Sequence, residues 1–291
     1  MDILLLFSPH FGILNAPLAS NGRIIRHQQK KRSEVMDIWK ELRDEGIDPS
    51  LLEEIQHFRA AHPVPPEAAA RIPAPQCLYY GKEVWESAAA ALLCGQHLLL
   101  AGPKATGKNV LAENLAAVFG RPVWDVSMYV NVDAAALIGA DTLQKGEVVF
   151  REGPICRCAR LGGFGVLDEV NMAKNEALAV LHATLDHRRV IDVPGYERIT
   201  LDDATRFIGT MNYGYAGTRE LNEALVSRFA VLDMPVISDT DLQKLLRRTF
   251  PTLSAKWAEQ FALLFRDLRQ KCDSGEISTK TLDLRGLLAA L

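Results

Sequence analysis

The residues best suited to chemistry form a glycine-rich run between an apolar segment and an amphipathic one. The run is Gly102-Pro103-Lys104-Ala105-Thr106-Gly107-Lys108-Asn109. Residues 96–101 predict a buried strand, and residues 109–119 predict a helix with its large apolar side chains on one side. In that setting, the backbone N–H groups of the loop and of the helix start surround phosphate oxygens. The run therefore predicts a nucleoside triphosphate site in which Lys108 reaches the β and γ phosphates.

The position after the lysine departs from the usual pattern of such loops. A Ser or Thr hydroxyl normally stands there as a magnesium ligand, whereas this chain has Asn109. An amide oxygen is a neutral hard ligand, so Asn109 is a candidate metal ligand with a different reach. The alternative interpretation of the whole run is a glycine turn that binds nothing.

Polar side chains also end two apolar segments farther along the chain. Residues 165–167 predict a strand that leads into Asp168 and Glu169. We expect Asp168 to hold the metal, directly or through its water, and Glu169 to polarise the water that attacks the γ phosphate. Residues 206–211 predict another strand, whose terminal Asn212 is a candidate for orienting the same water. The alternative for Asn212 is a side chain that only caps a turn.

Arg228 ends the predicted helix at residues 222–228 and has two interpretations. A cation in this position can cap the carboxyl end of its own helix. It can also enter the site of a neighbouring subunit and offset the charge of the transition state. The residues themselves leave both interpretations open.

The order of the predicted elements is typical of a parallel sheet with helices on both faces. Strands are expected at residues 97–101, 123–128, 165–167, 206–211 and 230–234. The helices among them are expected at residues 109–119, 154–161, 174–187 and 222–228. After Pro235 the pattern becomes all helical, at residues 239–249, 252–272 and 279–291. That change predicts a small C-terminal helical domain.

The N-terminal part of the chain divides into two pieces. Residues 1–35 predict a flexible arm, or an upstream extension ahead of a functional start at Met36. Helices at residues 36–43 and 50–61 follow, then a proline-rich connector and a further helix at residues 81–93. We therefore expect four parts: residues 1–35, the helical segment and connector 36–77, the α/β nucleotide-binding domain 78–236, and the helical domain 237–291.

Two hairpins interrupt the alternation of strands and helices. One is predicted at residues 141–152 with its turn at Gly146, inside the second helix of the α/β domain. The other is predicted at residues 190–201, just before the strand that ends in Asn212. The alternative is that both are surface decoration without a role.

Composition narrows the classes of partner. The hydrophobic content of 48% is enough for a full core, and the net charge of −3 gives no overall attraction to nucleic acid or to anionic membranes. No run approaches the roughly 20 apolar residues of a membrane-spanning helix. The five cysteines are scattered, without paired Cys-x2-Cys arms for zinc. We expect reduced thiols, a cytoplasmic protein and no membrane partner.

Together these features resemble the AAA+ ATPases of the MoxR branch, and within it the group of the rubisco-activating and nitric-oxide-reductase-activating proteins. The resemblance covers about residues 78–291. Besides the phosphate loop and the two strand ends, it rests on the runs at residues 137–139, 150–154, 181–189, 211–215 and 228–229. The fold that it implies is a P-loop core with a helix-2 insert, a pre-sensor insert and an all-helical C-terminal lid.

The resemblance also implies roles for individual residues. It implies a ring, usually hexameric, that binds ATP and Mg²⁺ at subunit interfaces, with Asn212 as the first sensor and Arg228 as the finger acting on the neighbour. The second sensor of the family is an arginine, which here is either replaced by Lys280 or supplied by Arg285. The two inserts would face the pore and carry Tyr196 and Glu197 to a protein client, often one with a von Willebrand factor A domain.

Four functions remain open at this point. The leading one is an ATP-hydrolysing remodeller that acts on a protein partner. Asn109 and Lys280 motivate a nucleotide-gated scaffold with weak hydrolysis, against which Glu169 argues because a pure switch needs no base. The basic stretch at residues 23–32 is the one local feature that favours a nucleic-acid motor, and the net charge of −3 argues against it. A metal-chelatase ATPase subunit is a variant of the remodeller.

Overall fold

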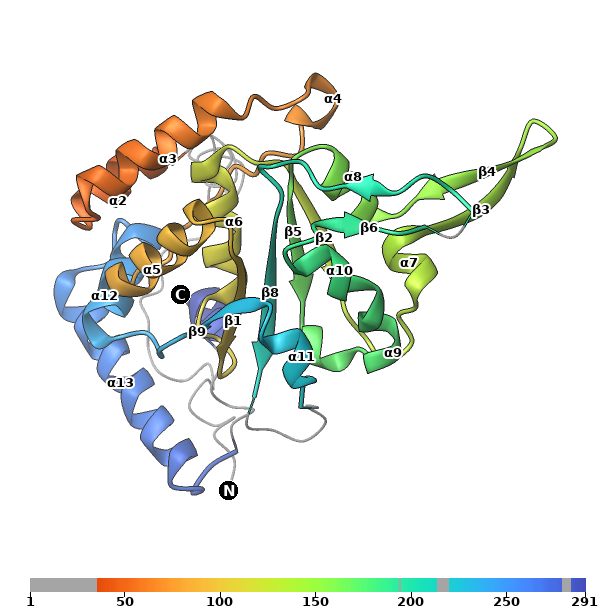
Figure 1. Cartoon of the computed structure of the whole chain (residues 1–291). Helices are drawn as coiled ribbons and strands as arrows, with labels where there is room; N and C mark the ends of the chain where they lie inside the picture. The colour runs from red at the N-terminus through yellow and green to blue at the C-terminus, as the bar shows by residue number, and fades with distance from the viewer. Residues whose placement is uncertain (1–35, 194, 214–219, 279–283) are drawn as a thin grey trace, which may run out of the picture. The chain divides into compact units, whose positions relative to one another are not determined.

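The computed structural model describes residues 36–193, 195–213, 220–278 and 284–291 of the chain (Figure 1). Five parallel strands form its central sheet in the order β2-β5-β8-β1-β9. They are β1 (His97–Gly102), β2 (Val123–Ser127), β5 (Phe164–Asp168), β8 (Arg206–Asn212) and β9 (Phe229–Asp233). All five strands were expected from the sequence, and each observed boundary lies within one residue of the expected one.

Both faces of this sheet are buried, because neighbouring residues of one strand belong to two different apolar clusters. In β1, Leu98 and Leu100 lie in one cluster while Leu99 lies in the other, and all three side chains are fully buried. In β5, Val166 and Leu167 are divided in the same way. Side chains alternate between the faces of a strand, so a parallel sheet covered on both sides consists of continuous apolar runs. The predicted α/β class is confirmed.

Helices from the first part of the described chain lie over one face of the sheet, the last two on the strands and the first two packed on those helices (Figure 1). They are α2 (Ile38–Asp44), α3 (Pro49–Ala61), α5 (Lys82–Leu93) and α6 (Lys108–Phe119). Asp48 caps α3 by accepting a hydrogen bond from the backbone of Ser50 at 2.8 Å. Arg59 on α3 donates to the carbonyls of Ala117 and Val118 near the end of α6. The proline-rich connector contains a short helix, α4 (Pro66–Ala69), that the sequence analysis missed.

The other face is covered by α8 (Pro154–Arg160) and by a broken helical segment. The sequence predicted one helix over residues 174–187, and this prediction was wrong. The structure has α9 (Asn175–Leu178), a 3-10 turn (Ala179–Leu181) and α10 (His182–Leu185). The tighter turn contains Val180, a β-branched residue that an α-helix accommodates less well than a straight side chain.

Both predicted hairpins are present. The first consists of β3 (Gly139–Gln144) and β4 (Glu147–Glu152) and lies between α7 (Ala134–Ile138) and α8, so it interrupts the second helix of the core as expected. Its turn residues Lys145 and Gly146 both have positive φ, as a two-residue turn of this kind requires. The second hairpin is shorter, with β6 (Val190–Ile191) and β7 (Ile199–Thr200). Tyr196 joins the two hairpins through a 2.7 Å hydrogen bond to Asp141.

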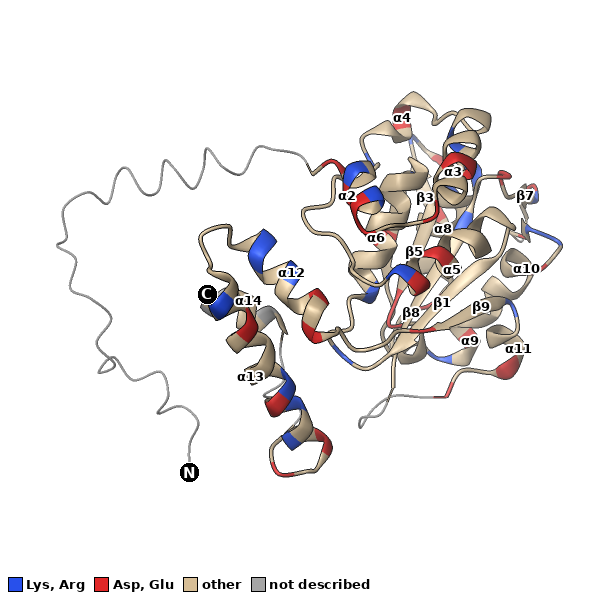
Figure 2. Ribbon diagram, turned by 90° about the vertical axis from the view of Figure 1, so that its left-hand side faces the viewer, with Lys and Arg blue, Asp and Glu red and all other residues tan. Residues whose placement is uncertain are grey.

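The C-terminal helices form a lid that packs on the N-terminal helices. The lid consists of α12 (Asp239–Thr249), α13 (Ala255–Asp273) and α14 (Leu284–Ala290), which lie together in Figure 2. The expected start of α13 at residue 252 was three residues early, because Ser254 caps this helix. Apolar side chains of α2, α12 and α13 belong to the same cluster as the core helices.

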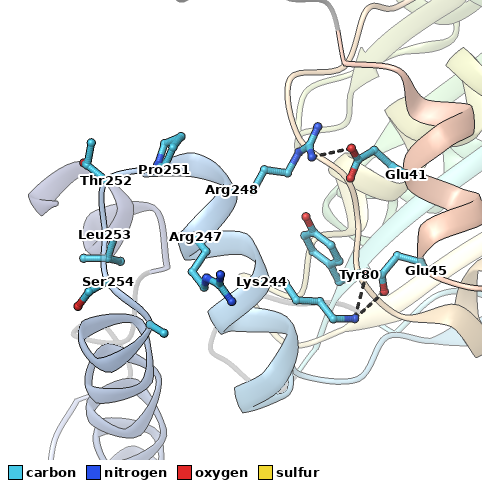
Figure 3. A pocket seen from close by; sticks show the side chains of 11 residues that line it. Glu41, Glu45, Tyr80, Lys244, Arg247, Arg248, Pro251, Thr252, Leu253 and Ser254 are labelled. Atoms are coloured by element: carbon cyan, nitrogen blue, oxygen red, sulfur yellow. Dashed lines mark hydrogen bonds and ion pairs between the residues drawn. The ribbon is translucent and has the colours of Figure 1, made fainter.

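Two ion pairs connect the lid to α2 across an open groove of about 700 Å³ (Figure 3). Lys244 on α12 binds Glu45 at 2.7 Å, and its ammonium lies 5.8 Å from the centre of the Tyr80 ring. Arg248 binds Glu41 at 2.6 Å. We call this set of contacts the lid clasp. Among the described side chains, none that we predicted to bind nucleotide lines the groove.

None of the helices in the described residues is long and apolar enough to cross a bilayer. No disulfide joins the five cysteines, all of which lie in the described part of the chain. Cys156 and Cys158 are buried on α8, and burial raises the pKa of both thiols. The cytoplasmic location stays a prediction.

Candidate nucleotide-binding site

The glycine-rich run connects the end of β1 to the start of α6, as its flanking patterns predicted. Ala105 and Gly107 have φ angles of 62° and 81° in the left-handed region, which curls the loop ahead of the helix. Gly107 is the N-cap of α6, and no side chain caps this end of the helix. The first N–H groups of α6 are therefore left to bind an anion, which the positive end of the helix dipole attracts.

Lys108 is the first residue of α6 and points back into the loop. Its Nζ donates to the carbonyl oxygens of Gly102 at 3.0 Å and Pro103 at 2.7 Å, and to the hydroxyl of Thr106 at 3.2 Å. Burial lowers the pKa of Lys108 from 10.5 to about 8, although the nearby carboxylates of Asp168 and Glu169 act in the opposite direction. The lysine thus occupies the centre of the loop, near both strand-end acids.

Tyr79 packs against the outside of the same loop. A Cβ atom added to Gly107 would lie 2.9 Å from the Tyr79 ring, which leaves room only for glycine. The backbone of Tyr79 is held by Asn114, a fully buried residue of α6 that accepts from the Tyr79 N–H at 2.7 Å and donates to the carbonyl of Cys77 at 2.9 Å. The segment before α5 is therefore fixed to the helix that follows the loop.

Asp168 and Asn212 lie at the same end of the sheet as the loop, because β5, β8 and β1 are parallel and in register. Asn212 pairs with Gly102 across β8 and β1, and Asp168 ends β5 on the other side of β8. The carboxyl ends of parallel strands meet at one edge of a sheet, where α/β folds bind their ligands. The structure thus brings together the phosphate loop, the two acids and Asn212, as the sequence predicted.

Thr210 connects the two acids. Its buried hydroxyl donates to Oδ1 of Asp168 at 2.7 Å and accepts from the backbone N–H of Glu169 at 3.0 Å. We did not predict a role for Thr210 from the sequence. The signal was available, because Thr210 stands two positions before Asn212 on the same strand and therefore on the same side of the sheet. Tyr79 and Asn114 gave no comparable signal, since their contact depends on packing between distant segments.

Glu169 is held in an unusual backbone conformation. Its φ of 56° lies in the left-handed region, where residues other than glycine are uncommon and often mark functional sites. Its Oε1 accepts a hydrogen bond from Nδ2 of Asn212 at 2.8 Å. Asn171 in turn donates to the carbonyl of Asn212 at 2.8 Å. The carboxylate of Glu169 is thus oriented by the residue that we predicted to act beside it.

The donor set at this edge fits a hard divalent cation. The Thr210 hydroxyl binds one oxygen of Asp168, and the exposed amide of Asn109 lies on the first turn of α6. Among the described residues, no group of three or more His, Cys, Asp or Glu side chains could hold a metal by itself. Mg²⁺ keeps several waters and binds through one or two protein oxygens together with substrate phosphates, so Asp168 and Asn109 are the residues here that could hold it.

Arg228 lies at the opposite end of the sheet, where the strands begin. It precedes Phe229, which pairs with His97 at the start of β1, whereas the phosphate loop begins at the end of this strand. A strand of six residues spans about 17 Å. Arg228 also donates to the carbonyl of Ala224 in α11 (Glu223–Val226), as expected for a cation that caps its own helix. It is therefore not part of the nucleotide site of its own chain.

Other candidate residues lie outside this site or outside the described residues. Lys280 is not among the described residues, and the side chain of Arg285 is likewise outside the description, so the second sensor stays a prediction. Tyr196 stacks on Phe150 with ring centres 5.0 Å apart, and it lies on the second hairpin with Glu197. Both hairpin residues belong to the inserts.

Comparison with known proteins agrees with this geometry. Residues 97–229 match the model of the AAA domain of the dynein-related subfamily. The uncharacterized protein YojN of Bacillus subtilis is 36% identical over 203 residues, which cover 68% of this chain and 67% of that protein. The chain belongs to the AAA family of ATPases. The uncharacterized protein SH1500 of Staphylococcus haemolyticus is 33% identical over 213 residues, 71% of this chain and 81% of the relative.

A solved structure has the same AAA fold. The crystal structure of a candidate ATPase from Cytophaga hutchinsonii matches with a TM-score of 0.51 and 16% sequence identity, over 78% of this chain and 67% of that one. At this level of identity the likeness concerns the fold alone. The AAA domain model begins at the first residue of β1, so the N-terminal helices and the lid lie outside the match.

Proposed function

We propose that this chain is a Mg²⁺-dependent AAA+ ATPase of the MoxR branch, which forms a ring and uses ATP hydrolysis to remodel or activate a protein partner. One observation carries the proposal. Four candidate residues lie together at the carboxyl end of the sheet, namely Lys108, Asp168, Glu169 and Asn212. Arg228 lies at the amino end. This division fits an ATP site that two neighbouring subunits share.

Within one subunit, the residues of the loop bind and orient the triphosphate. The N–H groups of the loop and of α6 surround the phosphates, and Lys108 exchanges its loop carbonyl partners for phosphate oxygens. Glu169 accepts the proton of the attacking water or polarises it, and Asn212 keeps its carboxylate in place. Asp168 and Asn109 would hold Mg²⁺, which supplies positive charge to the β and γ phosphates.

Arg228 is the finger that enters the neighbouring site. An arginine in this role is worth roughly 10³ to 10⁵ in rate, about 4 to 7 kcal/mol of activation free energy. A lone subunit is therefore nearly inactive, and turnover depends on assembly into a closed ring, usually hexameric in this branch.

The two hairpins are the proposed contact with the client. Leu143 and Val148 face each other near the end of the first hairpin and are 74% and 67% exposed. Tyr196 of the second hairpin packs on the same hairpin through Asp141 and Phe150. An exposed apolar pair on a supported hairpin suits a protein surface better than a nucleic acid. A protein with a von Willebrand factor A domain is the partner class that the branch resemblance favours.

Mixing two inactive variants tests the shared site. Lys108→Ala removes phosphate binding and keeps the finger, whereas Arg228→Ala keeps phosphate binding and removes the finger. Each variant alone should lose nearly all steady-state phosphate release. Rings coexpressed from equal amounts should regain about a quarter of wild-type turnover, because one interface in four combines an intact loop with an intact finger. Absence of any recovery, or full activity of the Arg228→Ala protein, contradicts the proposal.

The second candidate is a nucleotide-gated scaffold that binds ATP and hydrolyses it poorly. Asn109 favours it, because this residue replaces the usual hydroxyl ligand of magnesium. Replacing Glu169 with Gln distinguishes the two functions. If the chain is an ATPase, phosphate release is lost while ATP binding remains. If it is a scaffold, the substitution has no effect on the low turnover of the wild type.

A further inference from the structure

Asp186 is a carboxylate at the end of α10 that two arginines share. Its side chain is only 12% exposed. Arg188 binds it through Nε at 3.1 Å to each carboxylate oxygen, through Nη2 at 2.6 Å and through its backbone N–H at 2.9 Å. Arg228 approaches the same carboxylate, with Nη2 3.6 Å from Oδ2. These hydrogen bonds from Arg188 hold the pKa of Asp186 well below its usual range, so the carboxylate is charged at neutral pH.

The guanidinium of Arg228 is fixed from three directions. Nε donates to the carbonyl of His182 at 3.1 Å, Nη1 donates to the carbonyl of Ala224, and Nη2 is paired with Asp186. A guanidinium has five N–H groups in a rigid plane. Two of them donate hydrogen bonds in these contacts, one from Nε and one from Nη1, and Nη2 takes part in an ion pair at 3.6 Å. One N–H on Nη1 and both on Nη2 therefore remain. Two such N–H groups side by side match two oxygens of a phosphate.

We propose that Asp186 is a positioning residue for the Arg228 finger, an inference that rests on the proposed shared ATP site. Asp186 holds the plane of the Arg228 guanidinium so that its remaining N–H groups face the phosphate of the neighbouring subunit. The side chain of Arg228 is 24% exposed. Part of the Arg228 side chain is therefore accessible to a neighbouring subunit, while most of its surface is covered by its own chain.

Charge explains why a carboxylate is needed at this point. Arg188 and Arg228 both carry permanent positive charge, and Asp186 lies between them. Without it, the two guanidiniums repel each other and Arg228 loses one of its three supports. With it, the cluster keeps one net positive charge, which suits an incoming anionic phosphate.

The test is Asp186→Asn in the full-length assembled protein, measured as kcat and KM for ATP. We expect kcat to fall about 100-fold, since a misplacement of about 1 Å in a catalytic group costs this much. The KM, ATP binding and ring size should stay unchanged. The matched control is Asp273→Asn, which removes an exposed acid paired with Arg269 at the end of α13 and should leave kcat unchanged.

A double variant separates positioning from a general structural role. If Asp186 acts through Arg228, adding Asp186→Asn to Arg228→Ala lowers kcat no further. If the single Asp186→Asn protein keeps wild-type kcat, or if the two losses multiply, the positioning role is overturned. Should the Asn variant fail to fold, Asp186→Glu keeps the charge and shifts it by one methylene. It should lower kcat severalfold, and wild-type kcat in that variant overturns the proposal.

If the shared ATP site is wrong, the two single variants give a different pair of results. If Arg228→Ala itself keeps wild-type turnover, then Arg228 is not a finger, and the proposed function fails together with the role of Asp186. If Arg228→Ala is inactive and Asp186→Asn is fully active, only the role of Asp186 fails.

Discussion

The pKa of Lys108 makes ATP binding sensitive to pH in an accessible range. The unliganded site buries its ammonium, and burial lowers the pKa from 10.5 to about 8. Phosphate oxygens stabilise the charged lysine, so its pKa is higher in the complex than in the free protein. ATP binding must therefore take up a proton whenever the pH exceeds about 8. Each pH unit above this value weakens the apparent affinity about tenfold.

The measurement is the dissociation constant of a fluorescent, non-hydrolysable ATP analogue between pH 7.5 and 9.5, at constant Mg²⁺ and ionic strength. The γ phosphate is already fully ionised in this range, because its second pKa lies near 6. Tyr79 beside the loop does not titrate there either, since burial raises its pKa to about 12. Calorimetry in two buffers of different ionisation enthalpy should detect the uptake of about one proton per nucleotide at pH 9.

The control variant is Lys108→Arg, in which the charge persists at every pH used. If this variant binds the analogue, its affinity should not depend on pH. A wild-type dissociation constant that stays within about twofold up to pH 9.5, with no proton uptake, refutes the reasoning, because a lysine with its ordinary pKa remains charged over this range.

Three further outcomes are expected. Asn114→Ala leaves the buried N–H of Tyr79 without its partner and should lower the free energy of unfolding in urea by about 3 kcal/mol. Thr210→Val keeps the shape of the side chain but removes the hydroxyl that holds Asp168, so kcat should fall about tenfold while ATP binding is retained. Lys244→Ala removes the ion pairs of a half-exposed lysine with Glu45 and Asp241, and it should lower the unfolding free energy by about 1 kcal/mol at low salt and by less at 1 M salt.

Each of these outcomes can fail separately. A stability of the Asn114→Ala protein equal to wild type means that the segment before α5 is not anchored by this side chain. Unchanged kcat in the Thr210→Val protein means that the hydroxyl does not orient the acids. A large, salt-independent loss of stability in the Lys244→Ala protein means that the lid clasp depends on packing rather than on charge.

The sequence was most informative where local pattern and fold topology agree. The phosphate loop and Asp168 could be placed because each follows an apolar strand, and parallel strands end at one edge. Asn212 followed from the same argument. The role of Thr210 was within reach of the alternation rule, yet a buried threonine in a strand has a plain packing explanation that is favoured in the absence of other evidence.

Long-range pairings were beyond sequence reasoning. Lys244 and Glu45 are 199 positions apart, and nothing in either local pattern indicates the partner. The same is true of Asp186 and Arg228, because the end of α10 meets the residue that follows α11 only in the folded chain. The break in the helix at Val180 was missed because apolar spacing alone does not distinguish a continuous helix from one with a tighter turn.

The lid clasp attaches the helices that precede the AAA domain to the C-terminal lid. The segment from α2 to α3 is attached at one end to the lid, through Lys244 and Arg248, and at the other to the last turn of α6 through Arg59. It therefore connects the lid to the helix that follows the phosphate loop. Because apolar side chains of α2, α12 and α13 also share one buried cluster, raising the salt concentration should weaken the two ion pairs without detaching the lid.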